Sequence, residues 1–268
     1  MSVYKNDKPE WVEQAMESIL SQTLKNDDVV IIRDGKVSDD IEKLLKKYEK
    51  RKDVRVVRLA QNRGLAHALN VGLKKCKNEL VARMDADDVM AKNRLKVQLA
   101  AFNKNQDLDI FGGQVAEFEE SLKNITGHRK VPTTADEIRK FAKLRNPCNH
   151  PSVMFKKSTI SRLGGYDDSI GRVEDYELWM RALNSGARVE NSPEILCYLR
   201  AGDYMVGRRK DWRTCSAQLQ LRKKFLLNGW INIIDFTKAS SAFIVIAVLP
   251  TPIVGLIYKK GLRSAAVR

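Results

Sequence analysis

Short runs of apolar residues alternate with longer helical segments over residues 1–118 of the chain. The apolar runs predict strands at 2–4, 29–32, 54–59, 80–84 and 108–118. Apolar residues that recur every three or four positions predict a helix starting at Pro9 and further helices at 38–51, 64–76 and 92–105. Strands that alternate with helices of this length are typical of βαβ units. The pattern therefore predicts an α/β fold with a mostly parallel, Rossmann-like central sheet flanked by helices.

Polar residues follow four of the predicted strands at the points where those strands end. They are Tyr4-Lys5-Asn6-Asp7, Arg33-Asp34-Gly35, Asn62-Arg63-Gly64 and Asp85-Ala86-Asp87-Asp88. Ligands of open α/β sheets bind at the carboxyl ends of the strands. An edge so rich in carboxylates repels a bare phosphate, whereas Mg²⁺ or Mn²⁺ bridges carboxylates to substrate phosphates. We therefore expect a divalent metal here. The sequence has no Walker A and no GxGxxG motif, which disfavours the usual ATP and dinucleotide classes.

The charge of the chain is unevenly distributed. Lys and Arg number 48 against 33 Asp and Glu, a formal net charge of +15. Residues 205–268 hold 12 basic and 2 acidic side chains, whereas residues 1–204 hold 36 and 31. A basic segment of this kind suits nucleic acid or an anionic membrane surface. Because the segment carries no nucleic-acid-binding motif and no row of stacking aromatic residues, we expect a membrane surface and no nucleic acid.

Cysteine usage and the first residues of the chain indicate a reducing compartment. The four cysteines Cys76, Cys148, Cys197 and Cys215 are widely spaced and form no CxxC pair, which disfavours a zinc site or a disulfide framework. Residues 1–20 lack the apolar run of a signal peptide. We therefore expect a cytoplasmic protein.

A series of ordered motifs carries a resemblance to a known family. They are MSVYKNDKPEWVEQAMESILSQT, VVIIRDG, NRGLAHALNVGL and ARMDADD, followed by HPSVMFKKS, LGGYDDSI and VEDYELWMRAL. The sequence resembles the family 2 glycosyltransferases with the GT-A fold, and above all the bacterial enzymes that assemble capsule, exopolysaccharide and O-antigen repeat units. The resemblance covers roughly residues 1–230. It implies an inverting, metal-dependent transfer of a sugar from a UDP-sugar to a hydroxyl of a saccharide acceptor carried on a lipid.

The resemblance implies roles for residues that bind the donor nucleotide. Tyr4 would contact the uracil base, and Asp34 would hydrogen-bond it. Asp85, the first carboxylate of the DxD motif, would meet the ribose or uridine edge. Arg63 would help to hold the nucleotide. These four positions all belong to the segments that follow predicted strands.

The resemblance also implies the metal ligands and the general base. Asp87 would bind Mn²⁺ or Mg²⁺ with Asp88 as support, and Asp175, paired with Glu174, would be the base. The chemistry fits, because an inverting transfer needs one carboxylate to deprotonate the acceptor and one cation to stabilise the leaving diphosphate. A purely structural role is the alternative both for the DxD carboxylates and for the Glu174–Asp175 pair. The DxD segment could be a strand-to-helix turn, and the two acids could only stabilise the start of their helix.

His150 and Trp179 are the candidate contacts of the acceptor. His150 precedes Pro151 and either shapes the acceptor site or caps a strand. Trp179 lies four residues after Asp175 in a helical pattern and forms either core or wall of the site.

The sequence departs from the family in two places. The common Asp-Asp-Gly-Ser motif is Arg33-Asp34-Gly35-Lys36 here, and the apolar residues that usually precede the first strand segment are missing before Ser2. These departures leave a second function open, in which a catalytically inactive GT-A domain binds nucleotide or glycan as the scaffold of a membrane assembly.

We expect three segments along the chain. Residues 1–204 would form the catalytic domain, with a nucleotide-sugar half at 1–118 and an acceptor half at 119–204. Residues 205–268 would form a basic and hydrophobic helical tail. The uncharged stretch Ala239–Tyr258 contains Pro250 and Pro252 and is flanked by basic residues. This pattern favours peripheral or monotopic association with the cytoplasmic face of the inner membrane; a true span and a helix packed on the catalytic domain are the alternatives.

Overall fold

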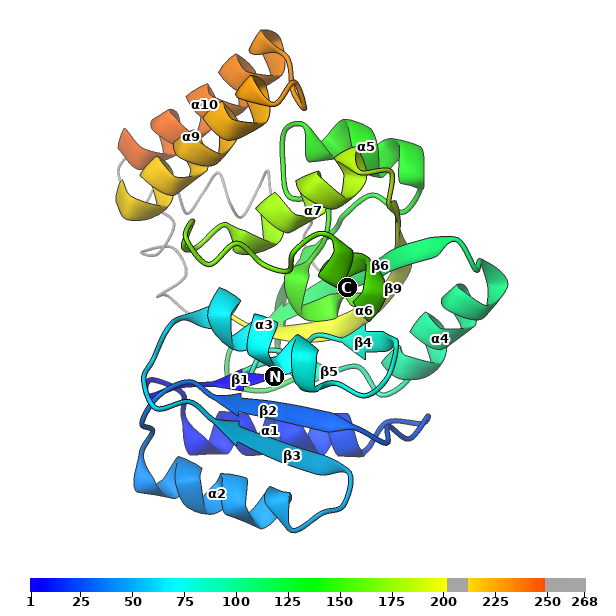
Figure 1. The fold of residues 1–268 in the computed structure, drawn as a ribbon, viewed down its shortest axis with the longest axis vertical. Helices are drawn as coiled ribbons and strands as arrows, with labels where there is room; N and C mark the ends of the chain where they lie inside the picture. The colour runs from blue at the N-terminus through cyan, green and yellow to red at the C-terminus, as the bar shows by residue number, and fades with distance from the viewer. Residues whose placement is uncertain (202–211, 249–268) are drawn as a thin grey trace.

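The computed structural model describes residues 1–201 and 212–248 (Figure 1). The first part of the chain forms β1 (Ser2–Val3), α1 (Pro9–Leu20), β2 (Val29–Arg33), α2 (Asp39–Glu49), β3 (Val54–Arg58), α3 (Leu65–Lys75), β4 (Leu80–Ala82), β5 (Val89–Met90), α4 (Arg94–Lys104) and β6 (Leu108–Phe118). The remainder forms β7 (Ile125–Arg129), α5 (Ala135–Ala142), the 3₁₀ turn η1 (His150–Ser152), β8 (Met154–Lys156), α6 (Lys157–Arg162), α7 (Glu174–Asn184), β9 (Arg188–Arg200), α9 (Trp212–Leu227) and α10 (Ile233–Val248). Every strand and helix predicted for residues 1–118 is confirmed to within a few residues, and β5 is an addition.

The N-terminal elements form a three-stranded parallel sheet in the order β1-β2-β3. Alternate residues of β2 point to opposite faces of the sheet, as the two-residue period of a strand requires. Val29 and Ile31 pack in one cluster with residues of α1 and α2, whereas Val30 and Ile32 pack against Ala68 of α3. Because both faces of β2 are covered by helices, this strand reads as a continuous apolar run.

The second sheet is mixed. Its strands lie in the order β4-β8-β6-β9-β5, and β7 pairs with β6. β6 and β9 are parallel, whereas the β4–β8, β6–β8, β5–β9 and β6–β7 pairs are antiparallel. The prediction of a mostly parallel sheet therefore holds for the first sheet alone. The short loop between β6 and β7 explains part of the difference, because a short connection joins antiparallel strands.

An apolar cavity of about 300 Å³ lies where the two sheets approach each other, beside Met1. Side chains of β2, α3 and β4 line it. The α-amino group of Met1 donates a hydrogen bond to the Val30 carbonyl at 3.0 Å, and burial lowers the pKa of this amine to about 6. The three-stranded sheet and the mixed sheet are therefore in contact through side chains at this cavity.

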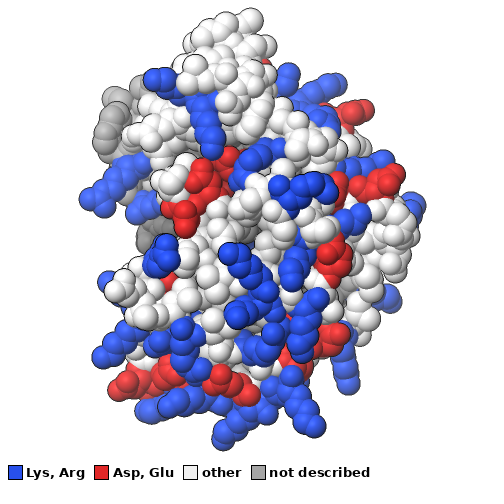
Figure 2. Space-filling view, viewed as in Figure 1, with Lys and Arg blue, Asp and Glu red and all other residues white. Residues whose placement is uncertain are grey.

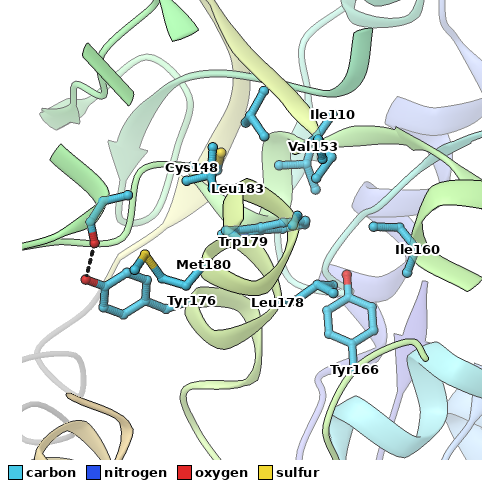
Figure 3. Packing of buried hydrophobic residues seen from close by; sticks show 14 of the residues in the cluster. Ile110, Cys148, Val153, Ile160, Tyr166, Tyr176, Leu178, Trp179, Met180 and Leu183 are labelled. Atoms are coloured by element: carbon cyan, nitrogen blue, oxygen red, sulfur yellow. Dashed lines mark hydrogen bonds between the residues drawn. The ribbon is translucent and has the colours of Figure 1, made fainter. Parts of the chain in front are cut away.

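Helix α7 is the centre of the main hydrophobic core (Figure 3). Leu178 and Trp179 have no exposed surface, and the hydroxyl of Tyr176 donates a hydrogen bond to the Ala142 carbonyl at 2.6 Å. Because the body of the helix is fixed by this packing, its first turn, which carries Glu174 and Asp175, is held in one place.

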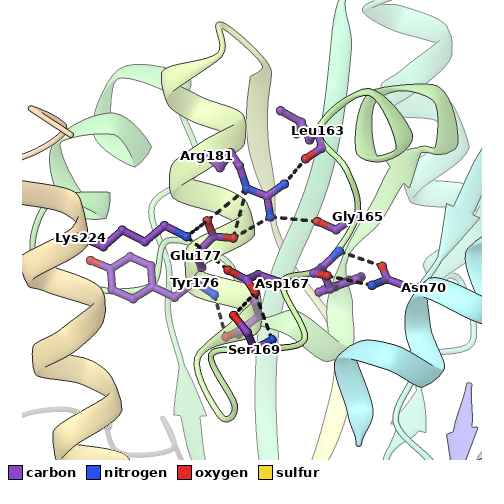
Figure 4. A network of polar contacts seen from close by, with 11 residues as sticks. Asn70, Leu163, Gly165, Asp167, Ser169, Tyr176, Glu177, Arg181 and Lys224 are labelled. Atoms are coloured by element: carbon purple, nitrogen blue, oxygen red, sulfur yellow. Dashed lines mark hydrogen bonds and ion pairs between the residues drawn. The ribbon is translucent and has the colours of Figure 1, made fainter. Parts of the chain in front are cut away.

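Helices α9 and α10 form a hairpin at the upper end of the molecule in Figure 1. Leu221 and Phe225 of α9 are buried in the same core as α7, and the Phe225 ring meets that of Tyr176 edge-on at 5.3 Å between centroids. Lys224 bridges to Asp167 at 3.3 Å and to Glu177 at 3.0 Å (Figure 4). The part of the expected tail within α9 is thus a helix packed on the catalytic domain.

No helix among residues 1–201 and 212–248 has both the length and the hydrophobicity that crossing a membrane requires. The uncharged stretch Ala239–Tyr258 starts inside α10, and its part beyond Val248 lies outside the described residues. Lys and Arg side chains are spread over the face shown in Figure 2, with acidic side chains among them.

Candidate functional site

A hollow of about 570 Å³ opens at the carboxyl ends of β1, β2 and β4. It brings together residues that are far apart in the sequence. Eight of the ten predicted site residues line it: Tyr4, Asp34, Asp85, Asp87, Asp88, His150, Glu174 and Asp175. Arg63 and Trp179 do not. The hollow therefore joins the predicted donor end to the predicted base.

Asp34 fixes the loop that follows β3. Its two carboxylate oxygens accept hydrogen bonds from the main-chain N–H groups of Arg63 at 2.9 Å and Gly64 at 3.0 Å. The neighbouring Gly35 has φ +81°, and a Cβ atom there would lie 2.5 Å from the main-chain nitrogen of Asn62. Only glycine allows this close approach. The side chain of Arg63 is exposed, so this residue contributes its backbone to the site.

Asp7 also lines the hollow, although no motif in the sequence marks it as a site residue. Its carboxylate accepts a hydrogen bond from the main-chain N–H of Tyr4 at 2.8 Å, and the ring of Tyr4 stays 40% exposed at the mouth of the hollow. Burial, with a further contribution from Asp87 and Asp85, raises the pKa of Asp7 to about 7. The one indication of its role in the sequence is its place in the polar segment that follows β1.

Asp85, Asp87 and Asp88 form a cluster with carboxylate oxygens within 4.8 Å of one another. The guanidinium of Arg83 donates to Asp85, and the main-chain N–H of Arg200 donates to Asp88 at 3.0 Å. Burial, followed by the charge of Asp85, raises the pKa of Asp87 to about 6, and the same causes raise that of Asp88. Carboxylates crowded in this way are the oxygen ligands that Mg²⁺ and Mn²⁺ prefer, so the cluster fits a divalent cation.

Glu174 and Asp175 line the same hollow from the first turn of α7. Asp175 accepts hydrogen bonds from the side-chain amide of Asn146 and from the main-chain N–H of Tyr176, both at 2.7 Å. Burial raises the pKa of Asp175, and burial with the charge of Asp175 raises that of Glu174 to about 7. A carboxylate with a pKa near the working pH suits proton abstraction. The partner Asn146 was missed in the sequence, where no motif marks it.

His150 and Trp179 lie one behind the other. The Nε2 atom of His150 is 3.0 Å from the hydroxyl oxygen of Tyr166, and burial, followed by the charge of Arg83, lowers the pKa of the imidazole, which is therefore neutral. Trp179 meets the His150 ring edge-on at 6.0 Å and has no exposed surface. The predicted contact of Trp179 with the acceptor is therefore wrong. Trp179 is one turn after Asp175 on the same face of α7. At that turn the helix face is already covered by the core, and His150 lies between the tryptophan and the hollow.

Arg94 joins two segments that border the hollow. Its fully buried guanidinium donates to the carbonyls of Arg83 at 2.8 Å, Pro151 at 2.7 Å and Val153 at 3.0 Å. These carbonyls flank the DxD segment and the His150 turn. No pattern in the sequence indicates this role, because an arginine in a helical segment is usually a surface residue.

The sequence matches the model of glycosyl transferase family 2 over residues 1–163. An uncharacterized glycosyltransferase of Haemophilus influenzae is 38% identical over 236 residues, which cover 85% of this chain and 87% of that protein. The amylovoran biosynthesis glycosyltransferase AmsE of Erwinia amylovora is 32% identical, covering 97% of each chain. The UDP-Gal:alpha-D-GlcNAc-diphosphoundecaprenol beta-1,3-galactosyltransferase of Escherichia coli is 34% identical, covering 98% of this chain and 95% of that protein.

Solved structures share the fold. TarS 1–349 of S. aureus in complex with UDP-GlcNAc has a TM-score of 0.65 at 17% identity and covers 91% of this chain and 71% of that one. The mannosyltransferase PcManGT of Pyrobaculum calidifontis, in complex with GDP-Man and Mn²⁺, has a TM-score of 0.60 at 16% identity, covering 96% and 77%. The fold is therefore the GT-A fold predicted from the sequence. With the family match and relatives over nearly its whole length, the chain belongs to glycosyl transferase family 2, and it is a glycosyltransferase of polysaccharide biosynthesis.

Proposed function

We propose that this glycosyltransferase moves a sugar from a UDP-sugar to a hydroxyl of a lipid-linked saccharide, with inversion at the anomeric carbon. The observation that carries the proposal is the hollow that both the Asp85–Asp88 cluster and the Glu174–Asp175 pair line. The names of the relatives support it, because one of them uses UDP-Gal and a GlcNAc-diphosphoundecaprenol acceptor, and the TarS structure holds UDP-GlcNAc.

The donor would lie between the β1 and β2 edge and the acid cluster. Tyr4 lies exposed at the mouth, where its ring is available to the uracil. Asp34 and the loop at Arg63 shape the nucleotide end, and Asp85 would meet the ribose. Asp87, with Asp88, would hold Mn²⁺ or Mg²⁺, which supplies a positive charge to stabilise the leaving diphosphate. Asp7 adds a further carboxylate to the same end of the hollow.

Asp175 would act as the general base, with Glu174 beside it. Its carboxylate takes the proton of the acceptor hydroxyl as the hydroxyl oxygen forms a bond to the anomeric carbon. The bond from that carbon to the diphosphate oxygen breaks at the same time, and its electron pair leaves with UDP. Asn146 orients the Asp175 carboxylate through the 2.7 Å hydrogen bond. His150 faces the same hollow as a neutral group and would contact the acceptor.

The α9–α10 hairpin would bind the enzyme peripherally to the cytoplasmic face of the inner membrane. Leu227, Ile233 and Ile234 around the turn of the hairpin are 75%, 61% and 59% exposed. Exposed Lys223 and Lys238 lie on the same two helices. Large apolar side chains accompanied by lysines suit an anionic lipid surface. Co-sedimentation with phosphatidylglycerol vesicles tests this: Leu227→Ser with Ile233→Ser should weaken binding, and unchanged binding would overturn it.

The first experiment is UDP release from a panel of UDP-sugars with Mn²⁺, with and without EDTA. We expect metal-dependent release with one sugar, and loss of that release in Asp175→Asn with retained UDP binding. If the wild type and Asp175→Asn both bind UDP but neither releases UDP from any UDP-sugar when a saccharide acceptor is present, the protein is a scaffold. That outcome would contradict the proposal.

A further inference from the structure

Arg83 is a buried cation that borders both the hollow and the apolar cavity beside Met1. The residue is 4% exposed, and its guanidinium donates a hydrogen bond to the Asp85 carboxylate. Within residues 1–201 and 212–248, Asp85 is the one hydrogen-bond partner of this side chain, and the Nε atom is buried without any. A buried charge with unused donors costs stability, and such groups are typical of functional sites.

A second buried arginine, Arg94, shows the contrast with a guanidinium that supports the fold. Arg94 donates to several main-chain carbonyls, and one of them is the carbonyl of Arg83 at 2.8 Å. The main-chain N–H of Arg83 donates to the Val153 carbonyl at 2.9 Å. The backbone of Arg83 is thus fixed on both sides, and its guanidinium reaches Asp85 from a rigid support.

Arg83 changes the charge that the acid cluster presents to a cation. Asp85, Asp87 and Asp88 bring three carboxylates together. Arg83 balances one of these charges through its ion pair with Asp85, and the two that remain match the charge of Mn²⁺ or Mg²⁺. Because Arg83 is buried and borders the apolar cavity, water and salt screen this ion pair little. The Asp85 side chain is 30% exposed, so a ligand in the hollow can reach it while it is paired.

We propose that Arg83 is a positioning residue that holds the Asp85 carboxylate for the nucleotide and keeps it from binding the metal, which Asp87 and Asp88 bind. This inference rests on the proposed function and adds how the two ligands of the donor site are kept apart. Without the donor, the cluster attracts a divalent cation weakly, because Arg83 offsets part of its charge. The donor diphosphate supplies further negative charge, so the cation and the nucleotide favour each other's binding.

Two probes that need no transfer reaction test the inference. They are Mn²⁺ alone, measured by electron paramagnetic resonance, and uridine alone, measured by NMR titration. In Arg83→Met, Mn²⁺ should bind about tenfold more tightly, because a repelling charge is lost and Asp85 is released. Uridine should bind about tenfold more weakly, because Asp85 is no longer held in place. Partial unfolding would weaken the binding of both probes, so the opposite signs distinguish a positioning role from a structural one.

Three further variants serve as controls. Arg83→Lys keeps the charge, so its Mn²⁺ affinity should stay within about twofold of the wild type. Arg58→Met removes an ion-paired arginine outside the hollow and should change neither affinity. In an Asp85→Asn background, adding Arg83→Met should not weaken uridine binding further, because Arg83 acts on the nucleotide through Asp85.

The outcomes separate the inference from the proposed reaction. Unchanged or weaker Mn²⁺ binding in Arg83→Met would overturn the inference, and so would unchanged uridine binding or a further loss in the Asp85→Asn background. If both probes shift as expected but no UDP-sugar yields UDP, the inference stands and the proposed reaction falls. If the wild type transfers sugar while Arg83→Met binds both probes as the wild type does, the reaction stands and the inference falls.

Discussion

Two regions of helix α7 hold carboxylates of similar burial in opposite surroundings. Glu177 is 1% exposed and is bonded to Arg181 at 2.6 Å and to Lys224 at 3.0 Å (Figure 4). Glu174, one turn earlier, is 8% exposed, and one of its carboxylate oxygens has no hydrogen-bond partner in the described part of the chain. Its neighbour Asp175 is bonded to an amide and a main-chain N–H, both neutral donors.

The charge of the partners distinguishes a buried carboxylate that stabilises the fold from one that is available for chemistry. Glu177 lies between Arg181 and Lys224. Arg181 donates hydrogen bonds to the carbonyls of Leu163 and Gly165, and Lys224 joins α7 to α9. Glu174 and Asp175 lack such ion pairs among the described residues, so burial raises their pKa values. Maintaining buried acids without cations costs stability, and such sites are typical of function. The Asp85–Asp88 cluster lies between the two kinds, because Asp85 pairs with Arg83 while burial and the neighbouring carboxylates still raise the pKa values of Asp87 and Asp88.

The largest effect should come from Asp175→Asn. We expect kcat to fall by about 10²–10⁴, the usual contribution of a general base, because the amide cannot accept the proton. UDP affinity should stay within about twofold, and titration calorimetry with UDP and Mn²⁺ measures it. Glu174→Gln is the matched control and should lose less. A larger loss in Glu174→Gln would assign the base to Glu174.

Removing a metal ligand should have the next largest effect. Asp87→Asn should weaken Mn²⁺ binding by about tenfold or more and weaken UDP binding with it, because one carboxylate of the cluster is lost. Electron paramagnetic resonance of free Mn²⁺ measures the affinity. Glu120→Gln removes an exposed carboxylate outside the hollow and should change neither. Equal Mn²⁺ affinity in wild type and Asp87→Asn would contradict the proposed ligand.

The pH dependence of activity should distinguish the proposed base from an ordinary carboxylate. A base must be deprotonated to act, so a raised pKa means that activity is lost as the pH falls through the raised value. Since burial raises the pKa of Asp175, we expect the acid limb of kcat/KM to lie above the ordinary range near pH 4. A limb at or below about pH 4 would contradict the assignment of Asp175 as the base.

Asn146→Ala should shift that limb. The hydrogen bond from Asn146 lowers the pKa of Asp175 by stabilising the carboxylate, so its loss should move the acid limb to higher pH. Activity at high pH should recover more fully than activity at pH 6. Asn146→Asp would add a charge beside Asp175 and should move the limb further in the same direction. An unshifted limb would mean that Asn146 only supports the fold.

The smallest effect should come from Lys224→Met. The side chain is 40% exposed, so we expect the free energy of unfolding to fall by no more than about 1 kcal/mol, with activity unchanged. Glu177 keeps Arg181 and is not left as an isolated charge. Lys223→Met on the exposed side of α9 is the control for urea denaturation. A loss of several kcal/mol would show that Glu177 depends on both cations.

The local parts of the structure could be predicted from sequence, and the long-range parts could not. β2 and α3 were readable because their apolar residues repeat with the period of the element. The convergence of the segments after β1, β2, β3 and β4 on one hollow could be predicted because topology brings strand ends together. Asn146 and Arg94 were not readable, since their roles depend on partners 29 and 57 residues away. The burial of Trp179 depends likewise on which part of its helix face the core covers.

The second sheet has a consequence for how new acceptor specificities are obtained in such enzymes. β4, β5 and β6 come from residues 1–118, and β7, β8 and β9 from the residues after them, yet the strand order alternates between the two groups. An exchange of residues 119–201 between relatives would cut the hydrogen-bonded edges of β6 with β7, β8 and β9, and of β4 and β5 with their partners. Recombination of whole halves is therefore a poor route to diversity. Point changes in the segment between α5 and η1, which lies outside the strands and borders the hollow at His150, leave every such edge intact.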